Sequence, residues 1–472
     1  MVPIKLSEIA KCCSGTYNCD VEINSVVIDT RKIEKGCLFI CIKGERFDAH
    51  QFIDEAFEKG AAAVMVSRDV SIDKPFVKVD DTAKQMLNLA GYYRSKFNIP
   101  VVGLTGSVGK TTTKEFTSLV VSSKYNTVKT QGNLNNEIGL PQMLFQFDES
   151  TQAAVIEMGM NHFGEIHRLV TATKPTVGII TNIGVSHIEN LGSREGILKA
   201  KLEILDGIED GSPLIINADN DMLKTVLDND DIVDRYNVIT VGIDGAWHYR
   251  ATNVSEDNGA TSFDINYCVE KNVPNHDGPK VVFATKKQHV VIPTIGIHNV
   301  YNALVAFATG IVLGIDSNAA ANALADYVPA GMRQKVVNVN GIISIEDCYN
   351  ASPDSMKAGI TTLADIKANK KIAVLSDMLE LGDYSKEAHY NVGKFAGENN
   401  IDCVYCVGND AQFIVKGAKD FGVKEAILFA DKQELINKLY ESVKSGDAVL
   451  FKASRGMKLE DVISSIYKRW ES

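Results

Sequence analysis

The sequence lacks any apolar run of the ~18 residues that a membrane-spanning helix needs, and its first residues lack the basic-then-apolar pattern of a signal peptide. We therefore expect a cytoplasmic protein without a membrane span. Positive charge is also scarce, because 49 Lys and Arg face 60 Asp and Glu, which gives a net charge of −11. Nucleic-acid binding needs a cationic face, so this balance argues against a nucleic-acid partner. Small anionic ligands remain compatible with the sequence wherever local cations offset the charge.

Cysteine and proline are sparse as well, with nine Cys and 11 Pro in 472 residues. No closely spaced pair of cysteines has a second pair at the spacing that zinc ligands need. Cys403 and Cys406 fall within an apolar run, which favours packed, reduced thiols over redox or metal chemistry. The composition is otherwise that of an ordinary globular protein, and the length is about three times the ~150 residues usual for one domain.

The pattern of apolar runs predicts an α/β protein of three domains, at 1–98, 99–330 and 331–472. The first mixes short strands, such as those predicted at 21–28, 38–42 and 62–66, with helices near 49–59 and 81–96. The second alternates strands and helices in the manner of a parallel sheet until about 242, and then shows short alternating segments that predict antiparallel strands up to about 293. The Pro329-Ala330-Gly331 turn opens the third, where five apolar runs alternate with helical patterns and predict a doubly wound, Rossmann-like unit.

A glycine-rich turn between a strand and a helix is the strongest local signal. Its backbone N–H groups and the helix N-terminus suit a triphosphate, Lys110 would neutralise phosphate, and the Thr111 hydroxyl could reach Mg²⁺. Leu104 stands where the common pattern has glycine, so a simple helix-capping turn is the alternative interpretation. The predicted ATP-binding residues here are Thr105, Gly106, Ser107, Val108, Gly109, Lys110, Thr111 and Thr112.

Two polar residues follow other apolar strands of the central domain. Glu157 comes directly after one strand, and His187 comes shortly after another. Since the carboxyl ends of parallel strands form the ligand-binding edge of such sheets, both could lie beside the phosphate loop and serve a Mg²⁺-nucleotide. His is an unusual Mg²⁺ ligand, and taken alone His187 would be interpreted as a structural or surface histidine.

Lys201 lies on a predicted helix over 194–206, where its neighbours at three and four positions are apolar, whereas those of Lys199 are largely polar. Lys201 therefore points into an apolar stripe. Burial lowers the pKa of a lysine, and a neutral amine can react with CO₂ to give an anionic carbamate that binds or orients a metal. The helix pattern alone leaves open a snorkelling or ion-paired lysine.

Further motifs follow in series along the whole chain. They are Asp29-Thr30-Arg31, the stretches 132–141 and 157–161, Thr181-Asn182-Ile183-Gly184, the stretches 296–303, 347–353 and 377–382, and Lys452-Ala453-Ser454-Arg455. In this order they resemble the Mur ligases, the ATP-dependent amide-forming enzymes of peptidoglycan synthesis, and most closely the MurF type. Tyr349-Asn350-Ala351 distinguishes that type from the ligase that adds the third residue of the stem peptide. Ser376 and Ala453 stand where the family pattern leads us to expect glycine.

The resemblance implies the three-domain Mur ligase architecture and a reaction that joins D-alanyl-D-alanine to UDP-N-acetylmuramoyl-tripeptide through an acyl phosphate. It implies ATP and Mg²⁺ as cofactors, small-molecule substrates as the partners, and a monomer. It assigns catalysis to Lys110, Glu157, His187 and Lys201, and the metal to Thr111, Glu157, His187 and carbamylated Lys201. It adds Asn299, Asn302, Arg333 and Asp347 to the ATP site, and predicts a substrate site from Thr30, Arg31, Asn133, Asn135, Asn136, Asn161, Asn350 and Ser352.

Several of these residues also have a purely structural interpretation. Asn299 and Asn302 would otherwise be a helix cap and a polar surface site, and Arg31 and Arg333 would be surface ion pairs. For the whole chain the alternatives are the Mur ligase that adds the third stem residue, and a degenerate ligase that binds nucleotide to signal to a partner protein.

Overall fold

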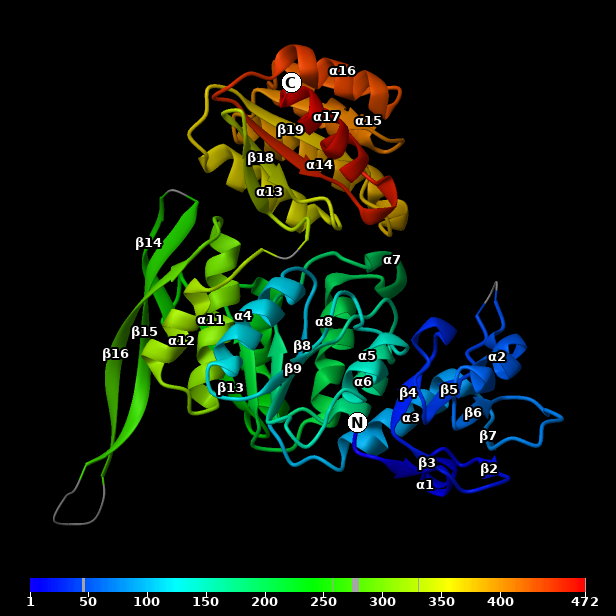
Figure 1. Cartoon of the computed structure of the whole chain (residues 1–472). Coiled ribbons are helices and arrows are strands. Elements are labelled where there is room, and N and C mark those ends of the chain that lie inside the picture. The colour runs from blue at the N-terminus through cyan, green and yellow to red at the C-terminus, as the bar shows by residue number, and fades with distance from the viewer. Residues whose placement is uncertain (45–46, 258, 274–279, 330, 472) are drawn as a thin grey trace.

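The computed structural model describes residues 1–44, 47–257, 259–273, 280–329 and 331–471. Its strands form one small two-stranded sheet and three larger sheets of five, nine and six strands within these residues. The larger sheets follow one another along the chain and, with their helices, make three α/β units (Figure 1). The predicted α/β class is confirmed. Ala330, in the predicted second boundary turn, lies outside the described residues, and the domain limits stay a prediction.

The N-terminal unit is built on the five-stranded sheet of order β2-β7-β6-β5-β4, in which only β2 runs antiparallel to its neighbour. Its elements are β1 (Ile4–Lys5), α1 (Leu6–Cys12), β2 (Thr16–Tyr17), β3 (Glu22–Ile23), β4 (Ser25–Val27), η1 (Thr30–Lys32), β5 (Cys37–Ile40), η2 (Ala49–Phe52), α2 (Ile53–Glu58), β6 (Ala63–Val66), β7 (Phe76–Lys78) and α3 (Thr82–Arg94). We expected one strand over 21–28. This was wrong, because β3 pairs with β1 in the small sheet while β4 pairs with β5.

The central unit carries the nine-stranded sheet, of order β16-β15-β14-β13-β12-β11-β8-β10-β9. Its elements are β8 (Val101–Thr105), α4 (Lys110–Ser122), β9 (Thr127–Lys129), α5 (Gly139–Leu144), β10 (Ala153–Glu157), α6 (Glu165–Thr173), β11 (Val177–Ile180), α7 (Ile188–Leu191), α8 (Arg194–Leu202), η3 (Glu203–Gly207), β12 (Pro213–Asn217), α9 (Asp221–Lys224), η4 (Thr225–Asp228), α10 (Asp230–Val233), β13 (Asn237–Gly242), β14 (Tyr249–Asp257), β15 (Ala260–Val273), β16 (Lys280–Ile292), α11 (Ile297–Val312) and α12 (Ser317–Ala325).

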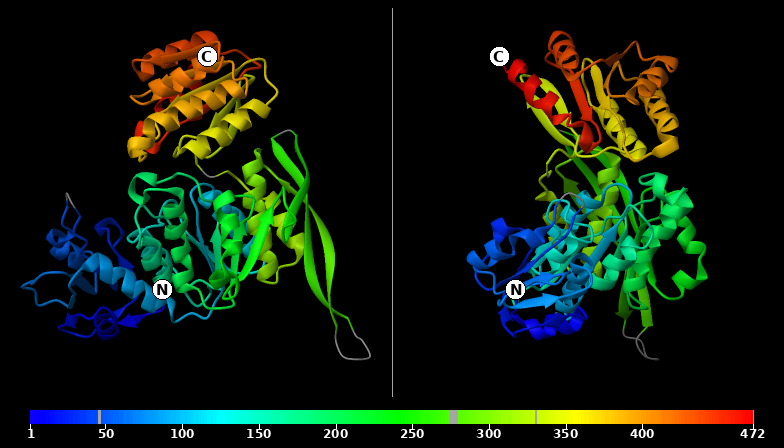
Figure 2. Two further views of the ribbon diagram at one scale, coloured as in Figure 1. Left: turned by 180° about the vertical axis from the view of Figure 1, so that it is seen from behind. Right: turned by 90° about the vertical axis from the view of Figure 1, so that its right-hand side faces the viewer.

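The strands from β9 to β14 run parallel, and β14, β15 and β16 form the antiparallel extension that the sequence predicted. In Figure 2 this extension projects from the body of the molecule. The central strand β8 lies between β10 and β11, so the loops that follow these three strands meet at one edge of the sheet. Open parallel sheets bind ligands at this edge.

The C-terminal unit contains a six-stranded sheet of order β17-β18-β22-β19-β20-β21, parallel except for β17. Its elements are β17 (Lys335–Val339), β18 (Ile342–Glu346), α13 (Pro353–Asp365), β19 (Lys371–Ser376), η5 (Gly382–Tyr384), α14 (Ser385–Glu398), β20 (Cys403–Val407), α15 (Ala411–Asp420), β21 (Glu425–Phe429), α16 (Lys432–Ser442), β22 (Ala448–Lys452), η6 (Arg455–Met457) and α17 (Glu460–Trp470). The five predicted strands are confirmed. The edge strand β17, with exposed polar positions, was not predicted.

The three units are joined in different ways. One continuous apolar cluster covers much of the N-terminal unit and one face of the central sheet, and Tyr93 from α3 donates a buried 2.5 Å hydrogen bond to the Phe147 carbonyl oxygen. The apolar clusters of the C-terminal unit, as described, contain only its own residues. The C-terminal unit therefore meets the central unit without a shared hydrophobic core. Along the part of the chain that the structure describes, no helix has the length and apolar character to cross a bilayer.

Candidate active site

A cavity of about 480 Å³ lies between the central and C-terminal units. Its walls come from the loops after β8, β9, β10 and β11, from α11, and from the C-terminal segments around 347–355, 379–381 and 452–456. The cavity brings together most of the residues that the sequence predicted. These are Ser107, Val108, Gly109, Lys110, Thr111, Thr112, Asn133, Asn135, Asn136, Glu157, Asn161, His187, Asn299, Asn302, Arg333, Asp347, Asn350 and Ser352.

The phosphate loop fills the turn between β8 and α4. Gly109 caps α4 with a φ of +83°, a left-handed conformation that glycine adopts without strain. Asn182, from the loop after β11, accepts hydrogen bonds at Oδ1 from the backbone N–H groups of Ser107 at 3.1 Å and Val108 at 2.8 Å. Asn182 thus holds the backbone of the loop in shape, and the first-turn N–H groups of α4 have no partner within their own helix.

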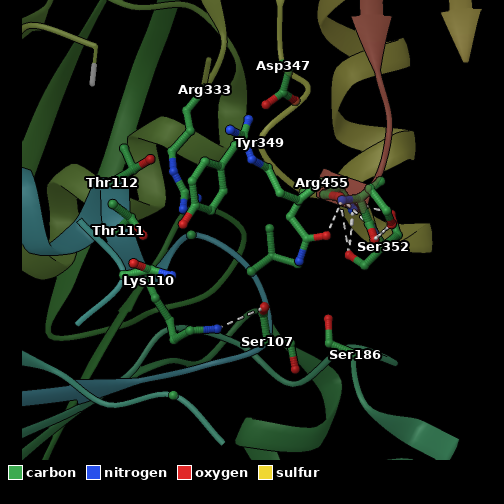
Figure 3. A pocket seen from close by; sticks show the side chains of 18 of the residues that line it. Ser107, Lys110, Thr111, Thr112, Ser186, Arg333, Asp347, Tyr349, Ser352 and Arg455 are labelled. Atoms are coloured by element: carbon green, nitrogen blue, oxygen red, sulfur yellow. Dashed lines mark hydrogen bonds between the residues drawn. The ribbon is translucent and has the colours of Figure 1, made fainter. Parts of the chain in front are cut away.

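Lys110 is partly exposed on the floor of this cavity (Figure 3). Its Nζ donates to the carbonyl oxygens of Gly106 at 2.7 Å and Ser107 at 3.3 Å. Partial burial lowers the pKa of Lys110, nearby Glu157 raises it, and Arg333 lowers it. A second cation therefore lies close to the ammonium group, and the two favour an anionic ligand.

Glu157, at the end of β10, is 2% exposed. Asn135 Nδ2 donates to its Oε1 at 2.8 Å, while its Oε2 is buried without a hydrogen-bond partner among the described atoms. An unpartnered buried carboxylate oxygen is unfavourable unless a cation or a donor occupies the space beside it. Oxygen atoms are the ligands that Mg²⁺ prefers, so Glu157, with the hydroxyl of Thr111 on the same cavity wall, fits a magnesium ion.

Lys201 lies on α8 and is 1% exposed, whereas Lys199 on the same helix is exposed. This confirms the predicted orientation of both side chains. Within the described residues, no carboxylate comes within ion-pair distance of the Lys201 ammonium group. Burial, with a further contribution from Lys110, lowers the pKa of Lys201 well below its ordinary value. Lys201 does not line the cavity, but its interaction with Lys110 places it close to the phosphate loop.

His187 precedes α7 and has a left-handed φ of +63°. Its Nδ1 is buried and forms no hydrogen bond to the described residues, but lies 3.0 Å from Oε2 of Glu380 in the C-terminal unit. The imidazole lowers the pKa of Glu380. His187 therefore lies in the cavity, as predicted, and at the junction of two units. No local pattern in the sequence indicates the contact with Glu380.

Asn299 and Asn302 lie on one face of α11, with exposures of 3% and 7%. Asn302 Nδ2 donates to Asn299 Oδ1 at 3.2 Å, and Asn299 Nδ2 donates to the Ile295 carbonyl oxygen and to Gln334 Oε1. Both face the cavity but are heavily hydrogen-bonded within the protein. Their role in the ATP site stays a prediction.

A few predicted residues lie elsewhere. Thr105 and Gly106 form the base of the phosphate loop behind the cavity wall, at the end of β8. Thr30 and Arg31 lie at η1 in the N-terminal unit and do not line the cavity, and exposed Arg31 pairs with Asp29 at 2.7 Å. These two predicted substrate residues thus lie apart from the phosphate site.

The structure adds Tyr349, Lys452 and Arg455, three residues that we did not predict individually. The Arg333 guanidinium lies 3.8 Å from the centre of the Tyr349 ring, with Arg455 6.0 Å away from the same ring (Figure 3). Buried Lys452 places its Nζ 2.5 Å from Oδ2 of Asp347. Tyr349, Lys452 and Arg455 all belong to motifs noted in the sequence, which was the available signal for their importance.

Family models match nearly the whole chain in three pieces. They are described as "Mur ligase family, catalytic domain" over 22–110, "Mur ligase middle domain" over 104–310, and "Mur ligase, glutamate ligase domain" over 332–455. The UDP-N-acetylmuramoyl-tripeptide--D-alanyl-D-alanine ligase of Bacillus subtilis is 38% identical, with 99% of both chains covered. The chain belongs to the Mur ligase family. The Escherichia coli ligase of the same name is 35% identical over 99% of both chains.

Solved Mur ligase structures share the fold. MurF from Acinetobacter baumannii superposes with a TM-score of 0.88 at 29% identity, covering 99% of both chains. MurF from Thermotoga maritima, solved in complex with ADP, has a TM-score of 0.82 at 28% identity and covers 95% of this chain and 98% of its own. The predicted family and architecture of this Mur ligase are thus confirmed over the full length of the chain.

Proposed function

We propose that this chain is the ATP-dependent ligase that joins D-alanyl-D-alanine to UDP-N-acetylmuramoyl-tripeptide, giving the UDP-linked pentapeptide precursor of peptidoglycan, ADP and phosphate. The observation that carries this function is the single cavity that the central and C-terminal units share. One wall is the phosphate loop, and the facing wall contains Tyr349 and Asn350 of the stretch that marks the MurF type. Full-length relatives with this activity in their names support the same conclusion.

The chemistry follows from the inertness of a carboxylate toward an amine. The terminal carboxylate oxygen of the tripeptide attacks the γ-phosphorus of ATP, the bond to the β–γ bridging oxygen breaks, and ADP leaves as the acyl phosphate forms. The dipeptide amine then attacks the acyl carbon and loses a proton, and the carbon–oxygen bond to phosphate breaks. Such reactions depend chiefly on positioning and on neutralising phosphate charge.

This chain supplies both. Lys110 would exchange its two carbonyl partners for phosphate oxygens, and Arg333 adds charge from the other side of the cavity. The first-turn N–H groups of α4 add further donors, together with the positive end of that helix. The ring of Tyr349 fixes the guanidinium of Arg333 where it faces this site. Asn299, Asn302 and Asp347 would hold the nucleoside end.

Magnesium fits the residues present. Glu157, with its unpartnered Oε2, and Thr111 would hold the ion, with His187 serving a second ion or its orientation. A bound ion would supply positive charge beside the phosphate oxygens. Lys201 would contribute as a carbamate: its neutral amine attacks the carbon of CO₂, the nitrogen loses a proton, and an anionic N-carboxylate remains. A buried lysine of lowered pKa, with no carboxylate partner among the described residues, suits this modification.

The remaining substrate contacts divide among the units. Thr30 and Arg31 would bind the uridine end, and Asn133, Asn135, Asn136 and Asn161 the region of the reacting carboxylate. Asn350 and Ser352 face the cavity from the C-terminal unit and would receive the dipeptide. Because ATP and UDP-linked precursors are cytoplasmic metabolites, we place the enzyme in the cytoplasm, and we expect it to act as a monomer.

The test incubates purified protein with ATP, Mg²⁺ and UDP-linked tripeptide, and measures phosphate with and without D-alanyl-D-alanine. We expect release only with the dipeptide, together with a product heavier by one dipeptide. Equal release in both samples would contradict the function. Release that depends on a single amino acid and UDP-linked dipeptide would indicate the ligase that adds the third residue. Nucleotide binding without turnover on any substrate would indicate the degenerate, signalling protein.

A further inference from the structure

Three loops of the C-terminal unit meet at one edge of its sheet. They follow β18, β22 and β19, which are neighbours in the sheet and run parallel, so their carboxyl ends lie together. Residues 350–352, 454–456 and 379–381 of these loops all line the cavity. Open α/β sheets bind ligands at this edge, and Asn350 and Ser352 are the residues that we expect to receive the dipeptide.

Leu379 is an exposed apolar side chain on this cavity wall. Its exposed fraction is 47%, whereas Leu381 of the same loop is 3% exposed and Met160 of the central unit is 5% exposed. A Cβ added to Gly456 would lie 3.0 Å from Cδ1 of Leu379, so the leucine packs on the loop after β22. Its exposed surface would leave water when an apolar group binds beside it, which favours such a ligand.

The hydroxyl group of Ser454 joins the loop that carries Leu379 to the loop of the predicted dipeptide residues. Its Oγ accepts a hydrogen bond from the Leu379 backbone N–H at 3.0 Å and donates one to the Ala351 carbonyl oxygen at 3.4 Å. Ala351 lies between Asn350 and Ser352 in the sequence and also lines the cavity. Leu379 is therefore held beside the residues that we expect to receive the dipeptide.

A buried histidine holds the same loop from the other side. His389, on α14, is 0% exposed, and its Nε2 accepts a 2.9 Å hydrogen bond from the Met378 backbone N–H. Its Nδ1 lies 2.7 Å from the Ser385 carbonyl oxygen, which can only accept. The two partners thus require a neutral imidazole with its proton on Nδ1. Both ring nitrogens of His389 are used to fix the residue that precedes Leu379.

The backbone turns sharply just after these two hydrogen bonds. Glu380 has a left-handed φ of +64°, which is unfavourable for a residue with a Cβ and persists only where the surroundings enforce it. The bonds from the N–H groups of Met378 and Leu379 fix the two residues before the turn. This arrangement keeps Leu379 exposed on the cavity wall, where a relaxed loop would be free to bury it.

The chemistry of the dipeptide indicates what Leu379 contacts. D-alanyl-D-alanine carries an amine, an amide, a carboxylate and two methyl side chains, and only the methyl groups are apolar. A hydrophobic contact discriminates between ligands that differ by one carbon by about tenfold or more. An apolar side chain beside the dipeptide residues would therefore distinguish alanine from glycine in the incoming dipeptide.

We propose that Leu379 contacts a methyl side chain of the dipeptide and so determines specificity for alanine, and that His389 is a positioning residue which holds Leu379 in place for this contact. The proposal rests on the proposed function, because it requires the dipeptide as the second substrate. It adds to that function the residue that recognises the side chain and the residue that supports it.

The contact is tested with Leu379→Ala and three dipeptides, D-alanyl-D-alanine, D-alanyl-glycine and glycyl-D-alanine. For the unchanged protein we expect kcat/KM to fall about tenfold when the contacted methyl group is missing, and for Leu379→Ala we expect this fall to shrink to about twofold. Leu428→Ala is the matched control, because Leu428 is a 43% exposed leucine of the same unit outside the cavity wall. This control should keep the tenfold preference.

Two results would overturn the contact. One is a fall of equal size in the unchanged protein and in Leu379→Ala for both shortened dipeptides, and the other is no fall with either of them in the unchanged protein. Failure of the unchanged protein to release phosphate with D-alanyl-D-alanine would instead count against the proposed function.

The positioning role is tested with His389→Leu and His389→Gln. The glutamine amide can accept from Met378 and donate to Ser385, whereas leucine leaves the Met378 N–H without a partner. We expect the KM for the dipeptide to rise about tenfold in His389→Leu with an unchanged KM for ATP, and to return close to normal in His389→Gln.

Equal impairment of both variants, or an equal rise in the KM for ATP, would overturn the positioning role. Melting temperatures show whether each variant folds. Should His389→Leu fail to fold, His389→Asn replaces it, because its shorter side chain cannot reach both partners at once. His389→Asn should then show the higher KM for the dipeptide, and a KM equal to that of His389→Gln would contradict the proposal.

Discussion

Thr113 Oγ1 donates a 3.0 Å hydrogen bond to Oδ1 of Asn302, linking the phosphate-loop helix α4 to α11 across 189 residues of sequence. A Cβ added to Gly109 would lie 2.7 Å from the same oxygen. Asn302 therefore packs against Gly109 of the phosphate loop and bonds to helix α4, in addition to any contact with nucleotide. This explains why a polar side chain is buried where the helix pattern alone suggested a surface position.

Gly109→Ala tests this support. We expect it to weaken binding of Mg²⁺-ATP by about 100-fold, because the methyl group strains a left-handed residue and displaces Asn302. The measurement is calorimetric titration. Gly211→Ala is the matched control, since Gly211 has a φ of +82° and open space around its Cβ position. Both variants should lose about 1–2 kcal/mol of stability, because each places a Cβ on a left-handed residue. The control should nevertheless keep its affinity for Mg²⁺-ATP. Equal losses of affinity in both variants would contradict this account.

Lys110→Ala should abolish turnover without unfolding the protein. Among the described residues, its ammonium group donates hydrogen bonds only to its own loop, so removing it costs little in the fold, while the phosphate charge loses a partner. We expect a fall in kcat of at least about 100-fold, as for other groups that stabilise charge in a transition state. Phosphate release and circular dichroism check this, and near-normal activity would remove the phosphate-loop assignment.

Lys201→Ala should also lose activity, and a small carboxylic acid such as formate should restore part of it by replacing the carbamate. The control is Lys199→Ala on the same helix, whose exposed side chain should be dispensable. Phosphate release is measured over a series of formate concentrations. Absence of rescue, with a folded protein, would count against the carbamate.

The buried lysine also predicts a pH dependence of stability. Burial lowers the pKa of Lys201 in the folded chain below its ordinary value of 10.5. At a pH between this lowered pKa and 10.5, the unfolded chain therefore holds a proton that the folded chain lacks. Raising the pH through this window therefore favours the folded state. We expect the stability advantage of Lys201→Met over the unchanged protein to shrink as the pH rises from about 7 to about 10. Urea unfolding in CO₂-free buffer measures this, and a constant difference would show that the amine stays charged.

Tyr349 offers a test of how Arg333 is placed. Tyr349→Phe keeps the aromatic face beneath the guanidinium, whereas Tyr349→Leu removes it. A cation–π contact contributes about 1 kcal/mol, so we expect a roughly fivefold higher KM for ATP in the leucine variant. The phenylalanine variant should behave normally. If both variants were impaired, the hydroxyl group and not the ring would be the important feature.

Local sequence signals predicted the phosphate loop, the buried Lys201 and the five parallel strands of the C-terminal unit, because each depends on residues a few positions apart. The pairing of β3 and β4 with different sheets could not be predicted, since strand partners are chosen by tertiary packing. The contact between His187 and Glu380 depends on how two units sit against each other, which no local pattern encodes. The family motifs include Tyr349 and Lys452. They do not reveal that the Tyr349 ring lies against Arg333, or that Lys452 pairs with buried Asp347.

The C-terminal unit has an apolar interior of its own, and this makes product release at the end of each catalytic cycle easier. Separation of this unit from the central unit would part surfaces that carry amide, hydroxyl, carboxylate and guanidinium groups, which water solvates readily, beside a few apolar side chains such as Met160 and Leu379. Release of bulky products would then need only the exchange of a handful of protein contacts for water contacts. Among the described residues, this separation would expose no apolar core to neighbouring molecules in a crowded cell.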